Sequence, residues 1–74
     1  MLTDYIRTRN ELETKYGTLW EDNVNFLQLI PSSLRKSALE IYLNSTMNKK
    51  DYKTMLASIY LNLKQIRELK ENAH

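Results

Sequence analysis

The sequence predicts an all-α fold, a compact four-helix domain with three short helices and one long C-terminal helix. Its 74 residues include one glycine and one proline, too few for the turns that many short strands require. Apolar residues recur at helical spacing in the last third of the chain, and helix-start signals precede several segments. A chain of this length supports one hydrophobic core, so we treat residues 1–74 as a single helical domain.

The first helix is predicted over about residues 4–16. Thr3 is a suitable N-cap, and Gly17 can adopt the left-handed backbone that ends a helix. Arg9 and Glu13, four residues apart, fall within the apolar side of this helix. Either their charged ends reach water at the edge of the core, or the pair sets the register of a contact with another chain.

The second helix is predicted over about residues 19–30. Thr18 and Glu21 have the spacing of a capping box, and Pro31 forces the residue before it out of α geometry. Because this segment is apolar almost all round, it should lie centrally, with Trp20 as an anchor of the core. The alternative for Trp20 is stacking on a ligand or lying in an interface.

The third helix should begin at Ser32 or Ser33, either of which can cap it, and end near Asn44. Its predicted core face consists of Leu34, Ala38, Ile41 and Tyr42.

The long fourth helix, about residues 49–71, has the best-defined start in the sequence. Asn48 and Asp51 form a capping pair, and Met47 can pack on Tyr52 as a hydrophobic staple. Its apolar residues follow a 3-4-3 spacing along one face: Leu56, Ile59, Leu63 and Ile66. A face of this length must be buried against something, and the shorter helices are the natural cover.

Basic residues are concentrated downstream. Residues 1–30 hold three basic and five acidic side chains, whereas residues 31–74 hold eight and four, and the chain as a whole carries +2. The basic candidates for binding a partner are Arg35, Lys36, Lys49, Lys50, Lys53 and Lys64. Positive charge in the first turns of a helix opposes the helix dipole, which favours an anionic partner there, an acidic protein or a nucleic acid. The alternative is an ordinary solvated face.

Three leucines are left over once the predicted helix faces are packed together. Leu39 and Leu43 lie away from the core face of the third helix, and Leu61 stands opposite the apolar face of the fourth. Either they are ordinary exposed leucines, or they form a surface for another protein or for a second copy of the chain.

The sequence offers little material for catalysis. The chain has no cysteine, and its single histidine is the last residue, His74. The sequence contains no phosphate-binding loop and no metal-ligand spacing, so we expect no catalytic residue, metal, cofactor or small-molecule substrate. We also expect no membrane segment, and the cysteine-free composition favours a cytoplasmic location.

These observations favour a non-catalytic regulatory or adaptor protein that binds another protein through its third and fourth helices, in one form as a homodimer. The short length suits a bacterial, phage or plasmid origin. The alternative function is a small DNA-binding regulator that uses the basic residues of the same two helices, although +2 is a modest charge for contacts to duplex phosphates.

Overall fold

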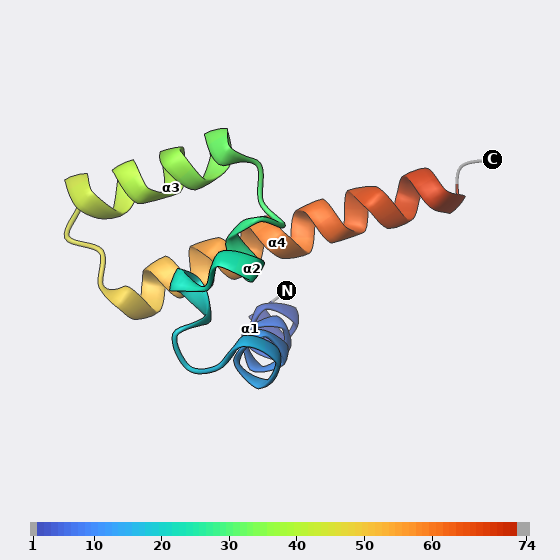
Figure 1. Cartoon of the computed structure of the whole chain (residues 1–74), viewed down its shortest axis with the longest axis horizontal. Helices are drawn as coiled ribbons and strands as arrows, with labels where there is room; N and C mark the ends of the chain where they lie inside the picture. Colours follow the sequence, from blue (N-terminus) through green and yellow to red (C-terminus); the bar gives the residue numbers. More distant parts are fainter. Residues whose placement is uncertain (1, 73–74) are drawn as a thin grey trace.

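The chain is organised around one long helix. The computed structural model describes residues 2–72, and within this range it contains four α-helices, one 3-10 helix and no strand (Figure 1). The elements are α1 (Leu2–Tyr16), η1 (Trp20–Asp22), α2 (Val24–Leu27), α3 (Ser32–Asn44) and α4 (Lys49–Asn72). The prediction of an all-α fold with a long C-terminal helix is confirmed.

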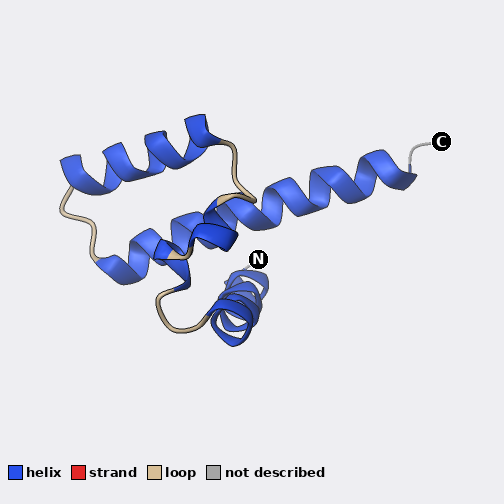
Figure 2. Cartoon of the chain, viewed as in Figure 1, coloured by secondary structure: helices blue, strands red, loops and turns tan. Residues whose placement is uncertain are grey.

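The four shorter helical segments surround only part of α4. α1 crosses α4, α3 runs back alongside it, and η1 and α2 lie between them, as Figures 1 and 2 show. The last turns of α4 extend beyond every other element. This projection is reflected in a radius of gyration of 12.7 Å, against about 11 Å for a compact chain of this length.

α1 ends where the sequence predicts and starts slightly earlier. Gly17 has a φ of +92°, and its N–H donates to the Glu13 carbonyl over 2.9 Å, so the expected glycine stop is confirmed. The helix begins at Leu2, so Thr3 lies within the first turn and the prediction of Thr3 as its N-cap is wrong.

The predicted continuous helix over residues 19–30 is wrong. Asn23 has an extended backbone (φ −76°, ψ 124°), and its side-chain Oδ1 accepts from the Asn25 N–H over 2.9 Å. Its Nδ2 also donates to the Tyr16 carbonyl over 3.5 Å. Asparagine competes with a helix in this way because its side chain can replace a backbone hydrogen-bond partner. The segment is therefore divided into η1 and the single turn of α2.

This division changes which side chains of the segment are buried. Trp20 is fully buried, as predicted for a core anchor, whereas Leu19 and Val24 are largely exposed. The proposed capping box of Thr18 and Glu21 is wrong, because Leu19 precedes η1 without a side-chain cap and Glu21 is buried instead. A helical projection that shows apolar residues on all sides thus does not apply once the segment divides at Asn23.

α3 has its predicted extent but a different start and a narrower core face. Pro31, rather than Ser32 or Ser33, occupies the N-cap, and its carbonyl accepts the first helical bonds from Leu34 and Arg35. Of the predicted core face, Ala38 is buried and Tyr42 is partly buried, but Leu34 and Ile41 are exposed. The prediction that these two residues belong to the core is therefore wrong.

α4 is a single unbroken helix of 24 residues, as predicted. The Asp51 N–H donates to the Asn48 side chain over 2.8 Å, which confirms the cap. Met47 packs against the buried cluster that contains Tyr52, in line with the expected staple.

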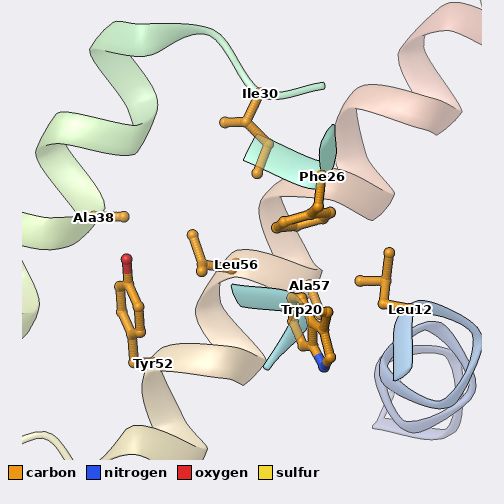
Figure 3. Close-up of a cluster of buried hydrophobic side chains, with 8 residues drawn as sticks. All are labelled: Leu12, Trp20, Phe26, Ile30, Ala38, Tyr52, Leu56 and Ala57. Carbon is orange, nitrogen blue, oxygen red and sulfur yellow. The ribbon is translucent and has the colours of Figure 1, made fainter. Parts of the chain in front are cut away.

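The core consists of eight buried side chains, drawn in Figure 3: Leu12, Trp20, Phe26, Ile30, Ala38, Tyr52, Leu56 and Ala57. Its centre is aromatic, since the rings of Trp20 and Phe26 meet edge to face with centroids 5.0 Å apart. Tyr16 and Tyr60 approach the same phenylalanine at 6.0 and 5.8 Å. The short segment between α1 and α3 therefore supplies the three bulkiest fully buried apolar side chains, which pack against α4.

Candidate functional site

Lys53, predicted to contact a partner, is instead the centre of a cluster within the chain. Its Nζ donates to the Thr18 carbonyl over 2.8 Å and lies 3.7 Å from Glu13 and 3.6 Å from Glu21. The same ammonium lies 5.7 Å from the centre of the Trp20 ring. Because the side chain is only 16% exposed, Lys53 joins α1, η1 and α4 rather than facing a partner.

Glu21 is the acidic side of this cluster and the most deeply buried charge among the described residues. Its side chain is 1% exposed, and neither Glu21 Oε2 nor the neighbouring Trp20 Nε1 has a hydrogen-bond partner. Burying a carboxylate costs about several kcal/mol unless an opposite charge lies close to it. Lys53 supplies that charge, so the pair serves the attachment of η1 to α4.

Lys49 and Arg35 are also engaged within the chain. Lys49 lies 3.8 Å from Asp22 and about equally over the rings of Tyr42 and Tyr52, at 5.8 and 5.5 Å. The Arg35 Nε donates to the Ile30 carbonyl over 3.0 Å, which closes the turn before α3. Both cations therefore stabilise the packing around the start of α4 and the start of α3.

The two tyrosines under Lys49 stack on one another and join α3 to α4. Their ring centroids are 4.6 Å apart and the ring planes differ by 25°. Burial raises the pKa of the Tyr52 hydroxyl above its ordinary value of 10.0, and the charges of Asp22 and Glu21 and the neighbouring Tyr42 raise it further. The neutral hydroxyl is thus favoured in this packed contact.

The other three predicted basic residues lie apart from one another. Lys36 is exposed on α3. Lys50 borders a depression between α1 and the start of α4, and Lys64 lies more than three helical turns further along α4. The six basic candidates therefore do not form one patch, and three of them already have partners in the chain.

Arg9 and Glu13 both reach across to α4. The Arg9 guanidinium donates to the Thr54 hydroxyl over 3.2 Å, and Glu13 lies 3.7 Å from Lys53. Arg9 is half-buried and Glu13 is exposed, which places the pair along the edge of the α1–α4 contact. Of the two interpretations of this pair, the geometry fits the edge of the core.

The predicted apolar candidates separate into two groups. Leu39 and Leu43 are 45% and 69% exposed on α3. Leu61 is only partly exposed and lies beside α1, in the wall of a depression that includes Arg7 and Thr8. The expectation that Leu61 is left uncovered is wrong, because α1 packs on that side of α4.

α3 exposes more apolar surface than the sequence predicts. Its four outward residues, which we call the apolar α3 surface, are Leu34, Leu39, Ile41 and Leu43. They lie on both sides of the line through Ala38 and Tyr42 along which α3 meets α4. Thirteen residues of helix therefore contribute one fully buried side chain to the core.

Sequence reasoning also missed the uncovered end of α4. Ile66 and Leu69 are 50% and 70% exposed, and Leu29 beside them is also exposed. The signal was present in the lengths, since 24 residues of helix reach about 36 Å while the helices that cover it have 15 and 13 residues. An apolar face that continues past its neighbours must end uncovered.

The side chains available for chemistry are few. No group of three histidine, cysteine, aspartate or glutamate side chains within residues 2–72 could hold a metal ion. The carboxylates of Glu13 and Glu21 both contact Lys53 and do not line any of the depressions described below. His74 lies outside the described residues.

Comparison of the chain with protein-family models, curated proteins and solved structures gives no match. In the described part of the chain, no helix has the length and apolar character needed to span a bilayer. The class that the fold itself defines is a small all-α protein with exposed apolar helix faces.

Proposed function

We propose that this chain is a non-catalytic regulatory or adaptor protein that binds another protein through α3 and the uncovered end of α4. The observation that carries the proposal is the apolar α3 surface, with four large side chains between 39% and 69% exposed on one helix. The four residues form two pairs, Leu34 with Ile41 and Leu39 with Leu43, that flank the contact with α4, and large exposed apolar areas on a monomer mark interaction surfaces.

Burial of the apolar α3 surface supplies part of the free energy that an interaction needs. Fully burying a leucine or isoleucine contributes about 1.5–3 kcal/mol, so four half-exposed side chains offer on the order of 4 kcal/mol before the costs of association. A second copy of the chain is one candidate partner, and the small size of the domain favours added burial of this kind. A cytoplasmic location remains part of this proposal.

The alternative, a DNA-binding regulator, has less support. Arg35, Lys49 and Lys53 are held by contacts within the chain, which leaves Lys36, Lys50 and Lys64 on separate parts of the surface. Sequence-independent affinity for duplex DNA requires several cations that reach phosphates together. If the alternative holds, affinity for duplex DNA falls steeply between about 50 and 200 mM salt; no binding at low salt excludes it.

The proposal is tested by Leu39→Glu combined with Leu43→Glu. Because both side chains are exposed, we expect the double variant to keep its helicity and melting temperature within about 0.5 kcal/mol of the parent. It should lose self-association in light scattering, or lose a protein that the parent captures from its native cytoplasm.

The matched control is Ser33→Glu with Ser37→Glu. It adds the same two charges at the same spacing on the same helix, on the side away from Leu39 and Leu43. The control should retain every association of the parent. Equal behaviour of the two double variants would contradict the proposal, and loss of helicity by the leucine variant alone would show that those side chains belong to the core.

A further inference from the structure

Two adjoining depressions lie where the end of α4 leaves the rest of the molecule. The first, of about 350 Å³, has an apolar floor formed by Tyr16, Leu29, Tyr60 and Leu63. The second, of about 260 Å³, is lined on its apolar side by Leu29, Pro31, Leu63 and Ile66. Leu29, Leu63 and Arg67 belong to both, so the depressions are neighbours across a common wall.

The fold creates this arrangement because the connection between α2 and α3 crosses α4 just before its projecting turns (Figures 1 and 2). Leu29 and Pro31 in that connection meet the side of α4 that would otherwise continue into the core. The result is a short apolar site between elements, whereas the apolar α3 surface is a convex face of a single helix.

The rim of these depressions is mainly positive. Four cations line it, Lys15, Lys64, Arg67 and Lys70, against two carboxylates, Glu68 and Glu71. Lys64, Arg67 and Lys70 form no ion pair within 4 Å with another described residue. The charges are therefore available to a ligand, and the second depression has cations alone on its rim.

We propose that the two depressions bind an acidic, amphipathic helical segment of another protein. This proposal rests on the proposed function, in which the uncovered end of α4 binds another protein, and it specifies the chemistry of that protein. Two apolar side chains of the segment, one helical turn apart, enter the neighbouring depressions, and its carboxylates pair with Arg67 and the lysines on either side.

The cationic rim and the apolar lining of the depressions favour an acidic helical segment over a second copy of the chain or a nucleic acid. A second copy of the chain that presented the same site would bring the same excess of cations to it. A nucleic acid would match the cations but not the apolar side chains of Leu29, Leu63 and Ile66 beneath them. An amphipathic acidic segment complements both features.

The experiment uses the full chain and three labelled synthetic peptides of 14 residues. The first carries leucines at i and i+4 with glutamates elsewhere on the exposed sides; the second replaces each glutamate by lysine, and the third replaces the leucines by serine. We expect the first peptide to bind in fluorescence anisotropy, and each of the others to bind at least about tenfold more weakly. Amide shifts in NMR should change around Leu29, Leu63 and Arg67.

Variants of the chain locate the binding. Arg67→Glu should weaken binding of the acidic peptide about fivefold or more, and Ile66→Ser by a similar factor. Arg7→Glu, an equal charge change at an exposed position of α1 outside both depressions, is the matched control and should leave affinity within about twofold. Circular dichroism checks that each variant remains folded, which the exposure of both tested residues favours.

Several outcomes would overturn the inference. Equal binding of the acidic and lysine peptides, an unchanged affinity after Arg67→Glu, or shifts confined to α3 would each do so. Binding of duplex DNA at the same residues without binding of any peptide would replace the acidic segment by a nucleic acid. The apolar α3 surface is tested by its own double variant, so failure here is distinguishable from failure of the proposed function.

Discussion

α1 and α3 both pack on α4, but different kinds of contact hold them there. On the α1 side, Leu12 is buried, Arg9 donates to Thr54, and Lys53 lies between Glu13 and Glu21. On the α3 side, Ala38 is buried and Tyr42 stacks on Tyr52. Between the described residues of α3 and α4 there is no side-chain hydrogen bond.

The difference separates the stable part of the molecule from the part available to a partner. Regions with few buried contacts open at lower free energy than the global unfolding transition. α3 combines a single buried side chain with four exposed large apolar residues, whereas α1 and η1 enclose the aromatic centre of the core. We therefore expect substitutions on the α1 side to change folding and substitutions on the α3 side to change local order.

Trp20→Ala should have the largest effect, because it empties the centre of the α1 side. Truncating a buried tryptophan costs about 3–5 kcal/mol, and a single core of this size supplies about the same. We expect the variant to be mostly unfolded at 25 °C by far-ultraviolet circular dichroism. Leu19→Ala, at the exposed neighbouring position, should change stability by less than about 0.5 kcal/mol. A folded Trp20→Ala variant would show that η1 is not central.

Lys53→Met should destabilise the chain by about 2–3 kcal/mol in urea unfolding, less than for a fully buried pair because Lys53 is partly exposed. The buried Glu21 carboxylate would lose its cation. Adding Glu21→Gln should recover part of this loss, since no unpaired charge then remains buried. Lys50→Met, at an exposed position, is the control. If the two methionine variants are equally stable, the cluster has no structural role.

Ala38→Leu should affect the α3 side by about 1–2 kcal/mol, because the larger side chain does not fit the contact with α4. Hydrogen exchange should accelerate in the amides of α3 and stay unchanged in those of α1. Ser37→Leu adds the same side chain at an exposed position and should leave both rates as they are. Equal acceleration in both helices would mean that α3 and α1 unfold together.

Tyr52→Phe should produce the smallest effect and only at high pH. The folded state raises the pKa of Tyr52 above 10.0, so the unfolded state loses its proton first and the free energy of unfolding falls as the pH rises above that value. Removing the hydroxyl should flatten this fall relative to the parent, while Tyr5→Phe on α1 removes a hydroxyl outside the stack. An identical pH profile for Tyr52→Phe and the parent would contradict the assignment.

The features that the sequence predicts best are those fixed by neighbours along the chain. The Asn48 cap and the Gly17 stop depend on a few consecutive residues, and both occur as expected. Asn23 also acts locally, and its capacity to cap a new turn was a signal that the segment over residues 19–30 would divide. The broad apolar pattern of that segment concealed it.

The candidate site was harder to predict because it depends on tertiary contacts. Nothing in the spacing of the lysines reveals that Lys53 meets Glu21 or that Lys49 covers two rings. Leu61 was predicted to be uncovered and Ile66 to be buried, and the structure shows the opposite. A helical projection gives the direction of a side chain but not whether another element covers it there. Leu39 and Leu43 were correctly predicted to be exposed, because helical spacing sets them apart from the side of α3 that faces α4.

The projecting turns of α4 have a further consequence for any ligand that settles on them. Ile66 and Leu69 are 50% and 70% exposed, so the helical form of these turns depends largely on local propensity, which is weak support for a few projecting turns. A ligand must therefore also meet the entropic cost of holding this end in shape. Replacing Asn62, an exposed residue just before these turns, by alanine, which favours helix more strongly, would then tighten binding without adding a single contact.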